Sequence, residues 1–219
     1  MNVDLVVFDW DGTLMDSKYH IIRAMQAAFV AQHLPAPSNE EVSEVIGLGL
    51  GVAIAELGRR LNQQRQIAIG HAYRVFYQQA ESAPPELFEG ARETLQALTD
   101  AGYLLAVATG KSRSGLNEAL GRTGLAPLFC MTRCADEAPS KPDPTMLLDI
   151  CTAFSIDPAR TLMVGDTEHD LKMAEHAGAL SAAVTFGVHS AERLRALGPH
   201  LMLDRLAQLP QLLRQPSEH

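Results

Sequence analysis

The chain has 219 residues, 47% of them hydrophobic and 20% charged, so it is long enough for a full core and a second small domain. Its formal net charge of −8 gives no basic surface for counterion release, which argues against DNA binding and predicts no nucleic-acid or membrane partner. The three cysteines include no CxxC pair and favour a reducing compartment. With no basic N-terminal region and an apolar run too short to cross a bilayer, we expect a cytoplasmic protein.

Short apolar runs rich in β-branched residues recur along the chain and predict strands that are covered on both faces. From about residue 85 onward these runs alternate with helical patterns. This alternation predicts an α/β fold with a doubly wound, Rossmann-like parallel sheet. The predicted strands are Val3–Phe8, Tyr103–Ala108, Thr161–Val164 and Leu180–Thr185.

One long stretch does not alternate. Residues 16–82 contain helical apolar stripes and a helix capping box but no convincing strand. A crossover between parallel strands needs only about a dozen residues. We therefore predict a small helical cap domain at 16–82, inserted into a core domain made of residues 1–15 and 83–219.

Most of the candidate reactive groups follow the predicted strands. In open α/β sheets, ligands bind beyond the carboxyl ends of the strands, so these groups are expected to converge on one pocket. They are Asp9, Asp11, Gly12 and Thr13 after the first strand, Thr109, Gly110 and Lys111 after the second, Asp166 and Asp170 after the third, and Lys141 in a loop before a helix.

Four carboxylates in one pocket repel one another. Two of them about 4 Å apart do so by roughly 4 kcal/mol at an effective dielectric constant of 20. Either their pKa values rise or a hard cation neutralises them, and oxygen ligands with few histidines favour Mg²⁺. Because Mg²⁺ combines few carboxylates with waters and phosphate oxygens, the pattern indicates phosphoryl chemistry.

The positions of these residues suggest roles. Asp9, fixed at the end of a strand, is placed to attack phosphorus and form an aspartyl-phosphate. Asp11 is placed to protonate the leaving oxygen and then to deprotonate water. Gly12 allows a close turn around the phosphate, while Thr109 would donate a hydrogen bond to it and Lys141 would offset its charge.

These motifs resemble the haloacid dehalogenase-like hydrolase superfamily. The resemblance rests on DxDGTxxD at Asp9–Asp16, the strand-terminal Thr109, the Lys-Pro pair at Lys141 and GDxxxD ending at Asp170, in the family's order and spacing. The DGTLxDS form is most similar to the phosphoglycolate phosphatase-like branch, which has a small α-helical cap. The resemblance covers essentially the whole chain.

The resemblance implies Mg²⁺ held by the side chains of Asp9 and Asp166 and by the backbone carbonyl of Asp11, with Asp170 assisting directly or through water. It also implies a cap that closes over the substrate, a small phosphorylated metabolite similar to phosphoglycolate. This branch often has asparagine where Gly110 stands, so the contacts of that loop with substrate differ from the family pattern.

The leading hypothesis is a Mg²⁺-dependent phosphatase. A sugar phosphomutase on the same scaffold is an alternative, although Thr13 favours the phosphatase, and Asp11 argues against a dehalogenase. A non-enzymatic phosphate-binding regulator is a second alternative, which the nucleophile and acid two residues apart argue against. We expect the phosphate or substrate to contact Gly12, Thr13, Gly110 and Lys111.

Several expectations concern residues outside the motifs. Asp16 and Ser17 are expected to start the first cap helix. The cysteines are expected to be buried thiols and not metal ligands. The protein is expected to be a monomer or a homodimer. Cap cations that are candidates for a substrate carboxylate are Lys18, Arg23, Arg59, Arg60 and Arg74.

Overall fold

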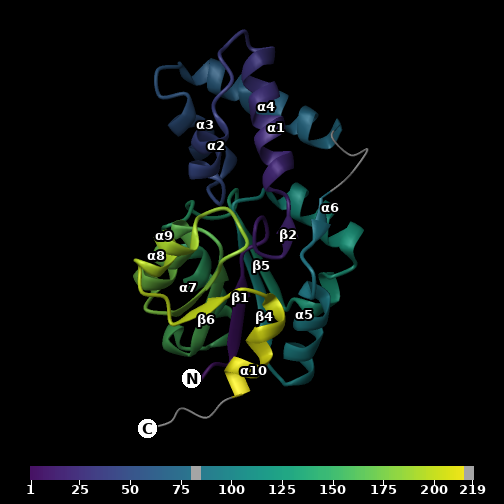
Figure 1. Cartoon of the computed structure of the whole chain (residues 1–219), viewed down its shortest axis with the longest axis vertical. Coiled ribbons are helices and arrows are strands. Elements are labelled where there is room, and N and C mark those ends of the chain that lie inside the picture. Colours follow the sequence, from purple (N-terminus) through teal and green to yellow (C-terminus); the bar gives the residue numbers. More distant parts are fainter. Residues whose placement is uncertain (80–84, 215–219) are drawn as a thin grey trace.

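The computed structural model describes residues 1–79 and 85–214 and contains a six-stranded sheet whose neighbouring strands are all parallel. The strand order is β5-β4-β1-β6-β7-β8, and the predicted doubly wound α/β fold is confirmed (Figure 1). The strands are β1 (Leu5–Phe8), β4 (Leu104–Thr109), β5 (Met131–Cys134), β6 (Thr161–Gly165), β7 (Leu180–Val184) and β8 (Leu201–Leu203).

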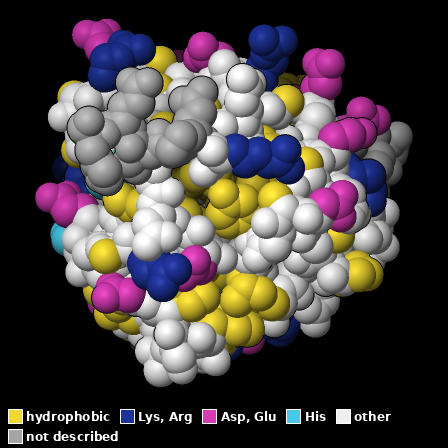
Figure 2. Space-filling model, turned by 90° about the horizontal axis from the view of Figure 1, so that it is seen from below, with side chains coloured by type: hydrophobic (Ala, Val, Ile, Leu, Met, Phe, Trp, Pro, Cys, Tyr) yellow, Lys and Arg dark blue, Asp and Glu magenta, His cyan; other side chains and the backbone are white. Residues whose placement is uncertain are grey.

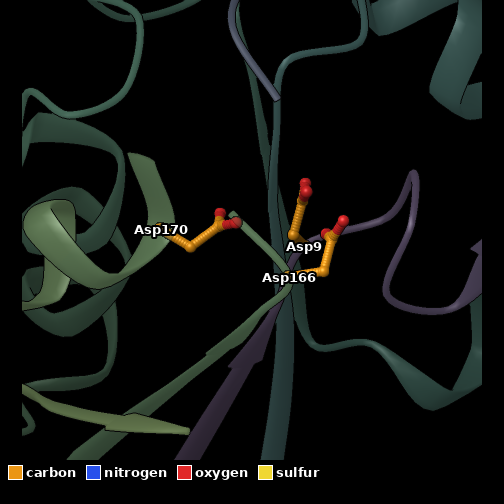
Figure 3. Close-up of side chains that lie close together, drawn as sticks. All are labelled: Asp9, Asp166 and Asp170. Carbon is orange, nitrogen blue, oxygen red and sulfur yellow. The ribbon is translucent and has the colours of Figure 1, made fainter. Parts of the chain in front are cut away.

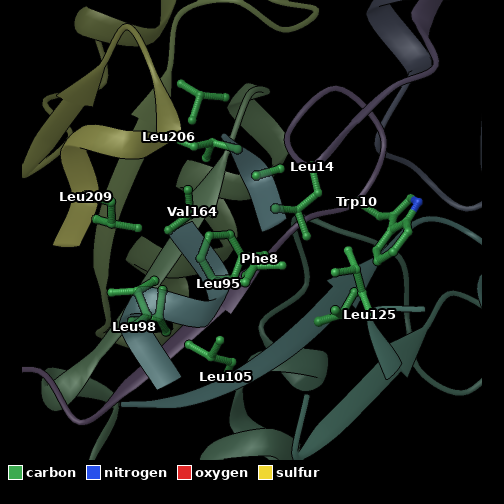
Figure 4. Close-up of a cluster of buried hydrophobic side chains, with 14 of the residues drawn as sticks. Phe8, Trp10, Leu14, Leu95, Leu98, Leu105, Leu125, Val164, Leu206 and Leu209 are labelled. Atoms are coloured by element: carbon green, nitrogen blue, oxygen red, sulfur yellow. The ribbon is translucent and has the colours of Figure 1, made fainter. Parts of the chain in front are cut away.

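Helices cover both faces of this sheet because the side chains of β1 alternate between two apolar clusters. Val6 and Phe8 pack on one face, and Leu5 and Val7 pack on the other. The first face meets α5 (Ala91–Asp100), α6 (Arg113–Thr123) and α10 (Leu209–Arg214), and the second meets α7 (Thr145–Phe154) and α8 (Glu168–Ala177). Figure 4 shows the first cluster, in which Phe8 lies among leucines of the surrounding helices.

The sequence did not predict the strands at the two edges of the sheet. β5 is a half-buried edge strand that contains Thr132 and Arg133, so it lacks a continuous apolar run. The apolar run of β8 has only three residues, which is too short to predict a strand from the sequence. Cys130, next to β5, is exposed, which corrects the expectation that all three thiols are buried; Cys134 and Cys151 are buried as expected.

Short elements complete the core side of the molecule. These are α9 (Ala191–Arg195) and the 3₁₀ helices η2 (Ala126–Leu128), η3 (Pro158–Arg160) and η4 (Leu206–Gln208).

A helical insert follows β1 and has an apolar core of its own. It consists of α1 (Lys18–Ala31), α2 (Asn39–Val45), α3 (Leu50–Leu57) and α4 (Gln63–Gln79). Ile22, Met25 and Phe29 of α1 pack with Ile54 and Ile69 from the other helices. The insert stands above the carboxyl end of the sheet in Figure 1. The predicted division at residues 82 and 83 falls outside the described residues and stays a prediction.

The segments that lead into and out of the helical insert pair as a two-stranded antiparallel ribbon. Met15 of β2 (Met15–Asp16) pairs with Leu87 of β3 (Glu86–Leu87), and Asp16 pairs with Glu86. Asp16 is therefore an exposed strand residue, and the expectation that it starts a helix is wrong. The helix cap lies one residue later, with Ser17 at the N-cap of α1.

The outer surface carries mixed charge. Figure 2 views the core end of the molecule, where acidic and basic side chains are interspersed with hydrophobic ones. Within the described residues, no helix is both long enough and apolar enough to cross a bilayer.

Candidate active site

The centre of the sheet places the predicted acids side by side. β1 lies between β4 and β6, so the residues that follow these three strands emerge at one edge. Asp9 directly follows β1 and its backbone N–H donates to the carbonyl of Val164 at 2.9 Å. Asp166 directly follows β6, and Thr109 is the last residue of β4. Figure 3 shows Asp9 and Asp166 projecting together from the ends of their strands, with Asp170 reaching in from α8.

Asp9, Asp166 and Asp170 form a buried acidic cluster. Each offers a carboxylate oxygen, and these oxygens lie within 4.8 Å of one another. Neither carboxylate oxygen of Asp9 accepts a hydrogen bond of good geometry from the described residues, although Lys141 Nζ lies 2.8 Å from Oδ1. Burial raises the pKa of Asp9, and the charges of Asp170 and Asp166 raise it further against the opposing effect of Lys141. A carboxylate that accepts no hydrogen bond of good geometry and lies beside two other buried carboxylates fits a hard divalent cation.

Asp166 is held in one orientation by the core. Its Oδ1 accepts a hydrogen bond from the Thr13 hydroxyl at 2.9 Å, and its Oδ2 accepts one from the Val188 N–H at 2.8 Å. Gly12, at φ +86°, passes so close that a Cβ there would lie 2.2 Å from Asp166 Oδ2, and a Cβ at Gly187 would lie 2.3 Å from the Asp166 Cβ. The Thr13 hydroxyl therefore orients a carboxylate, and the phosphate contact expected for Thr13 from the sequence stays a prediction.

Lys141 joins Asp9 to Asp170. Its fully buried ammonium lies 2.8 Å from Asp9 Oδ1 and donates to Asp170 Oδ1 at 2.6 Å. The other oxygen of Asp170 accepts hydrogen bonds from the Thr167 backbone N–H and hydroxyl, at 3.1 and 2.7 Å. Both oxygens of Asp170 thus accept hydrogen bonds, whereas Asp9 has only the Lys141 ammonium beside its Oδ1. Asp170 therefore fixes the position of the Lys141 ammonium and caps the first turn of α8.

Asp11 is held by side chains that the sequence did not connect with it. Lys111 Nζ lies 3.0 Å from both Asp11 carboxylate oxygens, and the Ser17 hydroxyl donates to Oδ1 at 2.6 Å. Lys111 also donates to the Tyr77 hydroxyl on α4 at 3.3 Å. The pKa of Lys111 is raised because the attraction of Asp11 and the two neighbouring tyrosines outweighs the opposing effect of burial. The DGTLxDS motif already contained Ser17, but nothing in the sequence pointed to Tyr77.

The loop between α2 and α3 rests on the core beside these acids. The Gly49 N–H donates to the Ser140 hydroxyl at 2.8 Å. A Cβ at Gly110 would lie 2.5 Å from the Leu48 carbonyl oxygen and 2.6 Å from that of Gly47. The absence of a side chain at Gly110 therefore lets the helical insert approach the sheet closely, and an asparagine there would require this loop to shift.

A pocket of about 510 Å³ lies between the helical insert and the sheet. Asp9, Asp11 and Thr109 line it at the carboxyl ends of the strands, and Gly110 and Lys111 line it as well. The buried Thr109 hydroxyl accepts a hydrogen bond from the Lys111 N–H at 3.2 Å, so its own proton is free to be donated. The structure thus brings the predicted motif residues to one region, with Asp166, Asp170 and Lys141 next to Asp9.

Comparison with known proteins agrees with this geometry. A family model described as haloacid dehalogenase-like hydrolase matches residues 6–184. The chain belongs to this family. Relatives that match nearly the whole chain are named phosphatases, and this haloacid dehalogenase-like hydrolase is a phosphatase as well.

The relatives of this hydrolase match nearly the whole chain. A probable phosphatase, IndB, of Dickeya dadantii is 36% identical over 94% of this chain and 91% of its own. A phosphoglycolate phosphatase of Vibrio vulnificus is 31% identical over 94% of each chain. An N-acetylmuramic acid 6-phosphate phosphatase of Pseudomonas aeruginosa is 30% identical over 97% of this chain and 96% of its own.

Solved structures share the fold of this hydrolase. The crystal structure of a predicted phosphoglycolate phosphatase from Haemophilus somnus superposes with a TM-score of 0.88 and 25% identity, covering 98% of this chain and 99% of that one.

Proposed function

We propose that this hydrolase removes the phosphoryl group from a small phosphorylated metabolite, with Mg²⁺, through an aspartyl-phosphate on Asp9. The observation that carries the proposal is the state of Asp9. Its carboxylate is buried, borders the pocket, and has oxygens that accept no hydrogen bond from the described residues. A carboxylate held only by an adjacent ammonium is available both to a cation and to phosphorus.

The residues that would hold Mg²⁺ are Asp9 and Asp166 through their side chains and Asp11 through its backbone carbonyl. Asp170, whose oxygens are both occupied, would act through a water molecule. When bound, the cation neutralises charge and polarises a phosphoryl oxygen. Thr13, Gly12 and the Val188 N–H keep Asp166 ready for this role, because they fix its carboxylate before the cation arrives.

The proposed reaction has two steps. In the first, one oxygen of Asp9 attacks phosphorus, the bond from phosphorus to the leaving oxygen breaks, and Asp11 gives that oxygen its proton. In the second, water attacks the aspartyl-phosphate, Asp11 takes its proton, and phosphate leaves with Asp9 restored. Lys111 and Ser17 stabilise the carboxylate form of Asp11 between the steps, while Lys141 and Thr109 offset the charge of the transferred group.

Hydrolysis of p-nitrophenyl phosphate tests this function. We expect turnover with Mg²⁺, loss of turnover when a chelator removes divalent cations, and recovery when excess Mg²⁺ is restored. Turnover that is indifferent to the chelator would contradict the proposed use of a cation. A protein that hydrolyses no phosphomonoester would contradict the function itself.

We also propose that residues 16–82 act as a cap that opens and closes on the β2–β3 ribbon. In that case Gly110→Ala should raise KM roughly tenfold, because its new methyl group would hold the Leu48 carbonyl away and keep the pocket open. The matched control is Gly121→Ala in α6, where a Cβ meets nothing within 4 Å. Steady-state kinetics of both variants check this, and an unchanged KM in Gly110→Ala would argue against closure.

Lys111→Met should lower kcat by roughly tenfold to a hundredfold, because a hydrogen bond to a charged group contributes about 1.5–3 kcal/mol. The effect is expected on kcat rather than KM, since Lys111 acts on Asp11 and not on bound phosphate. Lys172→Met, which removes a half-exposed lysine paired with Glu168, is the control and should leave kcat unchanged. If Lys111→Met raises KM and leaves kcat unchanged, the result would instead favour a direct contact between Lys111 and the substrate, as expected from the sequence.

A further inference from the structure

The pocket is much larger than the proposed chemistry at Asp9 requires. Its volume of about 510 Å³ lies within the range of roughly 300–1,000 Å³ that is typical of pockets for drug-sized ligands. A phosphoryl group beside Asp9 and Thr109 with a two-carbon acid attached would fill only one end of it. The remainder extends beneath the helical insert.

That remainder is lined by apolar and aromatic side chains. Tyr73 and Tyr77 lie one turn apart on α4, with ring centroids 5.8 Å apart and planes tilted by 30°. The Lys111 ammonium lies 4.9 Å from the centroid of the Tyr77 ring, and the remaining apolar surface of the two rings favours contact with aromatic or aliphatic groups. Apolar lining residues from the other helices of the insert and their loops are Ile21, Met25, Val45, Leu48 and Leu50.

Among the described residues, the cations that line the pocket are poorly placed to receive a substrate carboxylate. The ammonium of Lys111, which lies beside the reacting groups, is 3.0 Å from both oxygens of Asp11. Arg122 lies 3.7 Å from Glu118, and the Arg74 side chain is exposed at the rim with its guanidinium near the Gly70 carbonyl.

The other candidate cations of the helical insert do not line the pocket: Lys18, for example, donates to the Val188 carbonyl. Beside the reacting groups, a second anionic group on the substrate would therefore compete with Asp11 for Lys111, because the other two cations that line the pocket, Arg74 and Arg122, belong to exposed residues.

We propose that the substrate is a phosphomonoester whose organic group is an uncharged ring system and not a small carboxylic acid. The inference rests on the phosphatase function proposed above and specifies its substrate class. In the bound state, the phosphoryl group lies at Asp9 and the ring lies against Tyr73 and Tyr77, covered by the loop that contains Leu48. Selectivity arises from apolar area covered in the pocket.

Three alkyl phosphates with primary alcohols as leaving groups separate size from charge: ethyl phosphate, benzyl phosphate and phosphoglycolate. We expect kcat/KM for benzyl phosphate, measured with Mg²⁺, to exceed that for both others at least tenfold, since one methylene in an apolar pocket already contributes about tenfold or more. A kcat/KM for phosphoglycolate that equals or exceeds that for benzyl phosphate would overturn the inference and leave the phosphatase function standing. If the protein hydrolyses none of these three compounds and does not hydrolyse p-nitrophenyl phosphate either, both the substrate inference and the phosphatase function are overturned.

Two tyrosine variants test whether the preference for benzyl phosphate arises at Tyr73. Tyr73→Ala should lower kcat/KM for benzyl phosphate more than for ethyl phosphate, so that the ratio between the two falls several-fold. Tyr19→Ala, which removes a tyrosine that is 66% exposed on α1 and does not line the pocket, should keep the wild-type ratio. Thermal melting of both variants identifies any loss of folding. An unchanged ratio in a folded Tyr73→Ala protein would contradict the proposed position of the ring.

Discussion

Asp9→Asn is expected to lower kcat for p-nitrophenyl phosphate by roughly 10³–10⁶-fold, the range found when a nucleophile is removed from an enzyme that depends on it. The amide keeps the size of the side chain but cannot form the acyl-phosphate bond, and it weakens the attraction of Lys141, which lies 2.8 Å from Oδ1. Steady-state assays with saturating Mg²⁺ measure the effect. Activity that survives this change would exclude Asp9 as the nucleophile.

Two further variants separate the roles of the neighbouring acids. Asp16→Asn alters an exposed carboxylate in the same motif and should leave kcat unchanged. Asp11→Asn should lower steady-state kcat by about 10²–10⁴-fold. Because p-nitrophenolate leaves without needing an acid, Asp11→Asn should still release about one equivalent of it in a burst, with phosphate trapped on Asp9. The absence of both burst and trapped phosphate would count against an intermediate on Asp9.

Mg²⁺ is expected to raise the melting temperature, and more at pH 8 than at pH 6. Burial, followed by the charge of Asp170, raises the pKa of Asp166 from 3.8 to about 7 in the metal-free protein. Between about pH 4 and 7 the folded state therefore holds a proton that the unfolded chain has lost, so the free energy of unfolding falls as pH rises through this window. Bound Mg²⁺ offsets that loss, because it binds the ionised carboxylate.

The size of the effect follows from mass action. At a concentration about 100 times its dissociation constant, Mg²⁺ should stabilise the fold by about 2.7 kcal/mol, or roughly 5–10 °C in melting temperature. Asp166→Asn should raise the melting temperature of the chelated protein at pH 8 and remove the response to Mg²⁺, whereas Asp16→Asn should behave as wild type. A melting temperature that ignores Mg²⁺ at both pH values would contradict a cation at this cluster.

The centre of the fold could be predicted because each central strand is a short apolar run with both faces buried. Leu5–Phe8 and Thr161–Gly165 are fully buried in the structure, and Thr161 at the start of the second strand is their one polar residue, so little obscures the pattern. The edge strand at Met131–Cys134 has a solvent-facing side and therefore mixes polar with apolar residues. The Asp16 expectation failed because the ribbon pairing with Glu86 is a contact between residues seventy positions apart in the chain.

In the candidate site, too, local sequence patterns could be interpreted, whereas contacts between distant residues could not be predicted. Asp9, Asp11 and Asp166 could be placed together because parallel neighbouring strands end at one edge. Their partners could not, since Val188 reaches Asp166 and Lys111 reaches Asp11 across long sequence separations. Tyr77 in turn contacts Lys111 from α4. A hydroxyl such as that of Thr13 has several candidate acceptors in any acidic loop. The fold decides among them, because it places the Thr13 hydroxyl 2.9 Å from Asp166 Oδ1.

The ammonium of Lys141 lies inside the acidic cluster and partly neutralises its charge before any cation binds. Because Lys141 lies within 2.8 Å of both Asp9 and Asp170, two of the three clustered acids already have a counterion of the chain's own. We therefore expect a newly made chain to fold without waiting for a cation. Under the proposed function, Mg²⁺ would then bind to a cluster that is already assembled, so that folding and metal supply would be separate events.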